Sequence, residues 1–233
     1  MRLKRWIGVL LCISLLCFPA RAAESEKLVA LTFDDGPSGR FTRKLLDGLE
    51  ERGAKATFFL CGYRMEQYPD LTQRIWQDGH EIGLHGYSHR CFGNMCRGDV
   101  LRELEKTMAL VPEGCPVSFL RSPGGICGKC VQEAAGEMDL AELYWSVDPK
   151  DWATDDAGAI EKAVTSQVRD GDVILLHDMS DSSVEAALAI VDELQARGFR
   201  FVTASQLARE RNVSLIPGTK YTRFEKAELQ DAK

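Results

Sequence analysis

The chain has 233 residues, of which 29 are basic and 35 are acidic, and its formal net charge is -6 at pH 7. An acidic chain argues against a nucleic-acid partner, because binding to the phosphate backbone depends on basic side chains. The length is that of one sizeable α/β domain preceded by a short leader.

The first 22 residues have the pattern of an export signal. Basic residues come first, an apolar run from Trp6 to Pro19 follows, and Ala20 and Ala22 give the small-x-small form of a cleavage site. We expect a signal peptide over residues 1–22, a secreted or cell-envelope protein, and no stable membrane insertion after cleavage. A retained anchor is the alternative, although the apolar run is shorter than the roughly 20 residues that span a bilayer.

Cysteine usage fits an exported protein. Six of the 8 cysteines follow the leader: Cys61, Cys91, Cys96, Cys115, Cys127 and Cys130. An even number behind an export signal favours disulfides, with Cys91–Cys96 and Cys127–Cys130 as the local pairs. The alternative is a structural zinc site built from Cys127, Cys130 and another pair.

Short β-rich runs alternate with helical stretches from residue 28 to about residue 208. The expected strands are 28–33, 56–61, 81–85, 117–121, 143–148, 172–177 and 200–203. The expected helices are 41–52, 66–79, 98–110, 130–138, 157–169, 183–197 and 204–211. This order is typical of βα units and favours an α/β barrel of one domain over an open sheet.

The barrel prediction sets the domain boundaries. We expect the catalytic domain over residues 23–211 and a polar tail over residues 212–233. The tail should fray after Pro217, because it is charged and has no apolar periodicity.

Polar residues follow the expected strands at the points where the strands end. They are Asp34 and Asp35, His85, Arg121, Asp148 and His177. In a barrel of parallel strands the carboxyl ends share one face, and catalytic groups come from that face. We therefore expect these side chains to converge.

The segment that ends the first strand carries two adjacent carboxylates, Asp34 and Asp35, before a Gly36-Pro37 turn. Adjacent carboxylates repel each other unless a cation or a proton lies between them. One of the two is therefore suited to bind a metal, and the other is suited to act as a base. A turn that caps the next helix is the alternative.

The second segment carries His85 and His89, four residues apart. A helical turn would place both imidazoles on one face, where they could bind one transition metal together with a carboxylate. A pair of surface histidines is the alternative. Three of the 4 histidines lie at or just after expected strand ends, which favours the metal site.

Three further segments supply polar groups. Arg121 precedes the small residues 122–125, so its guanidinium can pair with a carboxylate while backbone N–H groups approach a ligand; a solvated turn is the alternative. Asp151 and Trp152 lie in the loop after the fifth strand, where the indole could be a substrate wall or core packing. His177 ends an apolar strand, and its pKa range suits a general acid.

Together the segments TFDDGP (32–37), SVDPKDW (146–152) and LLH (175–177) resemble the polysaccharide deacetylase family, also called the NodB-homology or carbohydrate esterase family 4 domain. The resemblance extends over residues 28–207 in the family's motif order. It implies a distorted (β/α) barrel and a hydrolase that removes N-acetyl groups from a glycan and releases acetate. We also expect a monomer. It also implies one divalent transition metal, with zinc expected first and cobalt, manganese or nickel as alternatives.

The resemblance also implies a role for each matched residue. The metal ligands are Asp35, His85 and His89. The base, the arginine that holds it, the general acid and the aspartate that tunes that acid are Asp34, Arg121, His177 and Asp151. An oxyanion donor and two walls of the acetyl pocket are Gly124, Trp152 and Leu175.

Two positions depart from the family pattern. Gly86 stands where the family has a serine or threonine that steadies the metal loop, and Gly124 stands where it has a tyrosine. These departures motivate a glycan-binding protein without turnover as an alternative, and a hydrolase of acetyl esters or other linear amides is a second. Peptidoglycan or an exopolysaccharide is the expected substrate, followed by chitin oligomers.

Overall fold

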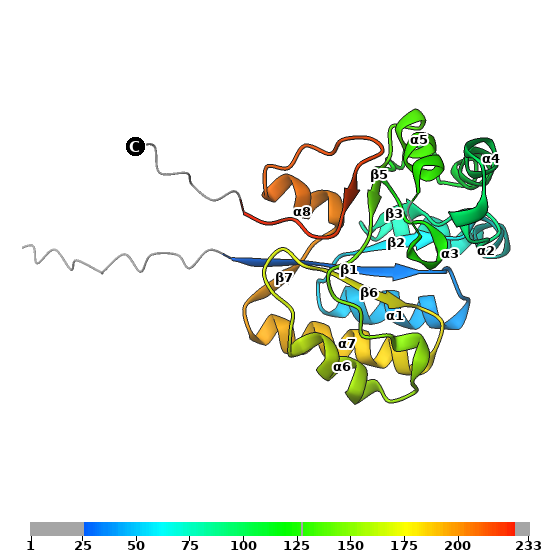
Figure 1. The fold of residues 1–233 in the computed structure, drawn as a ribbon. Coiled ribbons are helices and arrows are strands. Elements are labelled where there is room, and N and C mark those ends of the chain that lie inside the picture. Colours follow the sequence, from blue (N-terminus) through cyan, green and yellow to red (C-terminus); the bar gives the residue numbers. More distant parts are fainter. Residues whose placement is uncertain (1–25, 127, 227–233) are drawn as a thin grey trace, which may run out of the picture.

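The computed structural model describes residues 26–126 and 128–226. The predicted signal peptide lies outside these residues. Within them a sheet of parallel strands is flanked by helices (Figure 1). The strands are β1 (Lys27–Asp34), β2 (Ala56–Leu60), β3 (Glu81–Leu84), β4 (Phe119–Leu120), β5 (Ala141–Leu143), β6 (Val173–His177), β7 (Phe199–Phe201) and β8 (Lys220–Tyr221).

The helices lie between successive strands in the sequence. They are α1 (Arg40–Glu51), α2 (Gly62–Gln67), α3 (Pro69–Gln77), α4 (Arg97–Met108), α5 (Lys129–Glu137), α6 (Ala157–Thr165), α7 (Asp181–Ala196) and α8 (Ala204–Glu210). In Figure 1, α1, α6 and α7 lie together on one side of the molecule, and α2 to α5 gather on the other. No helix within the described ranges has the length and apolarity that a membrane crossing requires.

The strand order is β6-β1-β2-β3-β4-β5-β8, and β7 pairs with the start of β1. Every pairing between these strands is parallel. After β5 the chain crosses to the other edge of the sheet, which is formed by β6. There Val147 forms a parallel bridge with Ile174. Leu175 N–H donates to the Val147 carbonyl at 3.0 Å. The sheet therefore curls back on itself, and the predicted distorted (β/α) barrel of one domain is confirmed.

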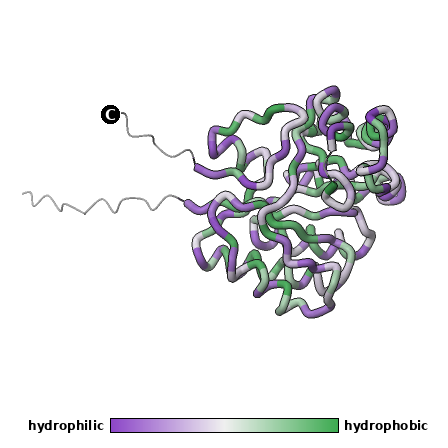
Figure 2. Tube along the Cα trace, viewed as in Figure 1, coloured by the Kyte–Doolittle hydropathy of each residue, from purple (hydrophilic) through white to green (hydrophobic). Residues whose placement is uncertain are grey.

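The central strand β1 is buried on both faces, which explains its almost continuous apolar sequence. Its odd-numbered residues 29–33 pack with α1 and α7, whereas Leu28 and Ala30 on the other face pack with Phe59. Asp34 continues this second face, because side chains alternate along a strand. Figure 2 shows the same distribution, with hydrophobic residues in the central strands and hydrophilic residues along the outer turns. The alternation thus places a carboxylate at the end of the barrel interior.

Two predicted elements need correction. The strand expected over 143–148 ends at Leu143, and an isolated bridge at Val147 follows it. The helix expected over 66–79 is two helices, α2 and α3, with a break at Tyr68. Pro69 begins α3, and a proline disfavours helical backbone at the residue before it.

The prediction that the chain frays after Pro217 is wrong for the residues described there. Lys220–Tyr221 form β8, which pairs with β5. Phe224 is 1% exposed, and its N–H donates to the Gly171 carbonyl at 2.9 Å. Arg223 bonds to Asp172 at 2.6 Å. A few residues with no periodicity can thus be held by one buried ring and one ion pair, which pattern reading does not detect.

The predicted Cys91–Cys96 disulfide is not formed. Both residues are free thiols, and Cys96 Sγ lies 3.1 Å from Asp99 Oδ2 at the start of α4. Between the two cysteines, a short 3-10 turn directs Phe92 into the core. The predicted Cys127–Cys130 pair falls on a residue outside the described part of the chain.

Candidate active site

The strand ends bring the predicted polar residues to one cavity. Asp34 and His177 are register partners at the ends of β1 and β6. The cavity has a volume of about 650 Å³ and is lined by every residue predicted for the site except Arg121, which lies behind Asp34. Residues distant in the sequence therefore share one surface, as expected for the carboxyl ends of barrel strands.

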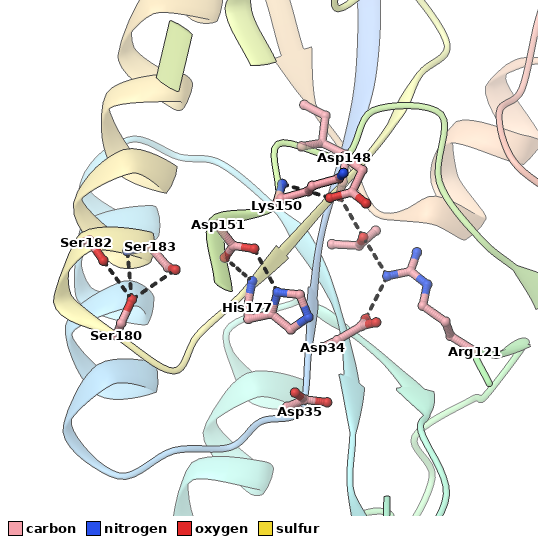
Figure 3. A network of polar contacts seen from close by, with 12 residues as sticks. Asp34, Asp35, Arg121, Asp148, Lys150, Asp151, His177, Ser180, Ser182 and Ser183 are labelled. Carbon is pink, nitrogen blue, oxygen red and sulfur yellow. Dashed lines mark hydrogen bonds and ion pairs between the residues drawn. The ribbon is translucent and has the colours of Figure 1, made fainter. Parts of the chain in front are cut away.

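The first part of the site is a buried pair of Asp34 and Arg121. The guanidinium donates to Asp34 Oδ1 at 2.7 Å and to Thr32 Oγ1 at 2.9 Å. Its remaining nitrogens donate to the carbonyls of Leu143 and Tyr144. Burial lowers the pKa of Arg121, and the charge of Asp34 opposes this effect. Each nitrogen of the guanidinium is thus hydrogen-bonded, and the arginine holds one carboxylate oxygen in a fixed position (Figure 3).

The second part is the pair of His177 and Asp151. Asp151 Oδ1 lies 2.8 Å from His177 Nδ1, and Asp151 Oδ2 accepts the His177 backbone N–H at 2.8 Å. Burial lowers the pKa of His177, but the hydrogen bond and charge of Asp151 raise it more, to about 9. The imidazole is therefore protonated at neutral pH and oriented by a carboxylate, as a general acid requires (Figure 3).

The third part combines Asp35, His85 and His89, whose ligand atoms all lie within 4.8 Å of one another. Asp35 Oδ1 is 3.3 Å from His85 Nε2 and 2.9 Å from His89 Nε2, yet this buried oxygen has no well-formed hydrogen bond to any described residue. Burial raises the pKa of Asp35, but the two imidazoles hold it well below its usual range. Contact with Asp35 raises the pKa of His89.

The tautomer of His85 suits metal binding. His85 Nδ1 lies 2.8 Å from the Arg121 carbonyl, which can only accept, so Nδ1 carries the proton. The lone pair of Nε2 then faces Asp35. A ring nitrogen bonded to a backbone carbonyl while the other faces a ligand position is the usual arrangement of a metal-binding histidine. The three side chains therefore fit one divalent transition metal.

The backbone between the two histidines is not the helical turn that the spacing suggested. Residues 85–90 contain neither helix nor strand, and φ is +76° at Gly86 and +58° at His89. The rings still lie close, with centroids 5.2 Å apart. A loop with two left-handed residues thus achieves the contact that a helix would have given.

The predicted substrate-binding residues also reach the cavity. Leu175 is almost buried, whereas Trp152 is 68% exposed at the rim. Gly124 has φ +71° and open space where a Cβ would be, so a ligand can approach its backbone closely. These positions fit the predicted walls and oxyanion donor, and their roles remain predictions.

Sequence reasoning missed one aromatic wall. Trp145 lines the cavity, and its ring lies so close to Gly125 that a Cβ there would approach it to 2.6 Å. It comes two residues after the end of β5, and this position could have identified it. Trp145 therefore supplies an aromatic surface beside the turn that contains Gly124.

Three groups surround one cavity: a carboxylate bonded to an arginine, a set of nitrogen and oxygen metal ligands, and a protonated imidazole. This combination defines a hydrolase centre on a (β/α) barrel. A model of the polysaccharide deacetylase family matches residues 21–143. This span includes Asp34, Asp35, His85, His89 and Arg121, and ends before Asp151 and His177. The chain belongs to the polysaccharide deacetylase family, and the prediction of an enzyme of this type is confirmed.

Curated relatives align with a larger part of the chain than the family model does. A peptidoglycan-N-acetylglucosamine deacetylase of Bacillus cereus is 38% identical over 81% of this chain and 91% of its own length. A chitooligosaccharide deacetylase of Sinorhizobium fredii is 35% identical over 77% of this chain and 91% of its own. The peptidoglycan-N-acetylmuramic acid deacetylase PdaC of Bacillus subtilis is 34% identical over 78% of this chain, which matches only 39% of that longer protein.

A solved structure shows the same fold. The family 4 acetyl xylan esterase of Clostridium thermocellum, in complex with a cobalt ion, superposes with a TM-score of 0.79 at 32% identity. The match covers 84% of this chain and 98% of the esterase.

Proposed function

We propose that this chain is a metal-dependent hydrolase that removes N-acetyl groups from an extracellular glycan and releases acetate. The observation that carries the proposal is the convergence of the Asp34–Arg121 pair, the three-ligand set and the His177–Asp151 pair on one cavity. Two of the relatives described above act on peptidoglycan, which makes it the first substrate to test. Chitin oligomers follow, because another relative is a chitooligosaccharide deacetylase.

Asp35, His85 and His89 would hold one divalent transition metal, with zinc proposed first and cobalt, manganese or nickel as alternatives. When bound, such an ion supplies Lewis-acid stabilisation of the reacting oxygens and lowers the pKa of water. One carboxylate and two imidazoles leave positions open for water and substrate, as catalytic sites need. The cobalt ion in the similar esterase supports this assignment.

Asp34 would act as the base that takes the proton from the attacking water. Its hydrogen bond with Arg121 holds one carboxylate oxygen and leaves the other oxygen free to face the cavity. His177 would then donate its proton to the nitrogen of the amino sugar as the bond to the acetyl carbon breaks. Asp151 holds the proton-donating ring in place throughout.

The remaining residues would hold the acetyl group. The Gly124 N–H would donate to the developing oxyanion. Leu175 and Trp152 would flank the methyl group and the sugar, since an apolar wall and an exposed indole suit these surfaces. We further propose that the protein acts as a monomer, secreted or at the cell envelope, after cleavage at residue 22.

The first test replaces the base. Asp34→Asn keeps the size of the side chain and removes its basicity, so acetate release from purified peptidoglycan should fall by roughly 10²- to 10⁴-fold. Metal content should stay near that of the wild type, because Asp34 is not one of the proposed ligands. Asp181→Asn, an exposed change on α7, is the matched control. Activity retained in Asp34→Asn would show that another group is the base.

A second test separates amide from ester hydrolysis, which the similarity to an acetyl xylan esterase makes a specific alternative. Acetate release is measured in parallel on peptidoglycan, chitin oligomers and acetylated xylan. Only amide hydrolysis also produces primary amines, so their appearance in step with acetate supports the proposal. Release from xylan alone would assign the chain to ester hydrolysis, and absence of release from all three substrates would favour a binding protein.

A further inference from the structure

We propose that Glu103 is a positioning residue that fixes the loop between His85 and His89 in its metal-binding conformation. The inference rests on the proposed metal site but not on the identity of the glycan. Glu103 lies on α4, outside the cavity and outside the motifs of the site. It therefore acts on the site through the loop backbone.

A single carboxylate of Glu103 binds three groups of the loop. Its Oε2 accepts the backbone N–H of Tyr87 at 2.9 Å and that of Ser88 at 2.8 Å. The Ser88 hydroxyl donates to Oε1 at 2.9 Å. Hydrogen bonds to a charged acceptor are about twice as strong as neutral ones, so this contact is a strong constraint on two successive residues.

The opposite side of the loop is tied to a different helix. The N–H groups of Gly62 and Tyr63, at the start of α2, donate to the carbonyls of Gly86 and Tyr87 at 3.0 Å each. The loop is thus held through its carbonyls by α2 and through its N–H groups by Glu103. Removal of Glu103 would leave the Tyr87 and Ser88 N–H groups without these bonds, while the contacts of the carbonyls with α2 would remain.

The loop needs such support because its backbone is strained. His89 has φ +58°, a conformation that costs a non-glycine residue about 1 to 2 kcal/mol. Gly86 has φ +76°, and a Cβ there would come within 2.9 Å of the Phe92 ring. No side chain could extend from position 86 without displacing that ring, so the support comes from another element.

The two histidines depend on the loop to different degrees. His85 directly follows β3 and is also bonded to the Arg121 carbonyl. His89 has a side chain that is 42% exposed, and its ring contacts Asp35 and the His85 ring. Its position follows from the backbone of Ser88, which Glu103 binds. We therefore expect the loss of Glu103 to release His89 more than His85.

The experiment compares Glu103→Gln with Glu105→Gln, which removes the same charge from an exposed position on α4. The dissociation constant for Zn²⁺ is measured by competition with a chelator, and exchange of the Tyr87 and Ser88 amides is followed in the metal-free protein. Loss of a partner behind a metal ligand typically weakens affinity by about 10- to 100-fold, and we expect a change in this range for Glu103→Gln. The two amides should exchange faster, while kcat at saturating Zn²⁺ should change less than the affinity does, because Glu103 does not line the cavity.

Glu103→Ala is a second variant. It is needed because the glutamine in Glu103→Gln keeps one acceptor oxygen, which could still bind the N–H groups of the loop. It should weaken Zn²⁺ binding at least as much as Glu103→Gln. Wild-type affinity and amide exchange in both variants would overturn the proposal, and so would equal losses in Glu105→Gln. If the wild type binds Zn²⁺ but releases no acetate, the proposed function fails while this inference is still tested by affinity and exchange.

Discussion

The two halves of the active site hold their side chains by different means. Asp34, Arg121 and His177 lie at the ends of regular strands, where sheet hydrogen bonds already define the backbone. His89 lies in an irregular loop that depends on Glu103 and α2. In the strand half every side chain is paired and the Asp34–Arg121 pair is buried, whereas in the loop half the ligand His89 is 42% exposed.

This difference shows where rigidity and adjustability lie in the site. A buried ion pair at a strand end cannot move without leaving a charge unpaired, so the proton-transfer groups stay in place. A loop held by a few hydrogen bonds can open at lower cost, which suits a ligand set that must accept a metal. We therefore expect changes in the strand half to affect global stability and changes in the loop half to affect metal binding.

The largest effect should come from Arg121→Met, which breaks the strand half. It leaves the Asp34 carboxylate buried without its cation and should lower the free energy of unfolding by about 3 to 5 kcal/mol. Arg40→Met removes an exposed pair with Asp181 and should cost no more than about 1 kcal/mol. Urea denaturation measures both. Similar losses in the two variants would show that burial does not distinguish the pairs.

A second change tests the proton donor in the same half. Burial lowers the pKa of His177, and Asp151→Asn removes the main group that raises it to about 9, although the charges of Asp34 and Asp35 still raise it in the variant. The pKa of His177 should therefore fall toward its ordinary 6.5, as followed by NMR of the imidazole. Because a general acid must be protonated, the alkaline limb of the activity profile should move to lower pH in parallel.

The same shift affects stability with a defined sign. The raised pKa of His177 in the folded protein stabilises it fully below pH 6.5, and this contribution is lost as the pH rises through about 9. The metal-free wild type should lose stability across this window, and Asp151→Asn should lose less. Asp155→Asn, a change of the same type on the cavity wall, should leave the titration of His177 near that of the wild type.

The smallest effect should come from Gly86→Ala in the loop half. A left-handed φ and the approach to Phe92 should lower the free energy of unfolding by about 1 to 2 kcal/mol. Gly136→Ala in α5 meets no atom within 4 Å and should raise it by about 0.5 to 1 kcal/mol. Opposite signs in urea denaturation would confirm that the local conformation and packing at Gly86, rather than the addition of a methyl group in general, are responsible. A neutral Gly86→Ala would show that the loop adapts.

The sequence predicted the strand half well, because its signals are local. An apolar run that ends in Asp34 and another that ends in His177 predict two strands, and parallel strands bring their carboxyl ends together. The same reasoning placed His85 and Arg121 on this face. The family resemblance then assigned roles that the local patterns left open.

The loop half was predicted only in part. The spacing of His85 and His89 indicated a metal site, but the helical geometry expected for it was wrong. The position of Gly86 suggested a loop without support, whereas the support comes from Glu103 on a helix that follows. A contact between two elements leaves no periodicity in either, so pattern reading could not detect it.

By itself, the sequence determined the succession of strands and helices, the strand-end position of most polar groups and the family. These follow from apolar periodicity and from motifs that lie within a few residues. Only the tertiary structure decided the closure at Val147, the packing of Phe224 and the burial of Arg121 beneath Asp34. Each of these depends on how separate elements pack against one another, and packing is a property of the assembled chain.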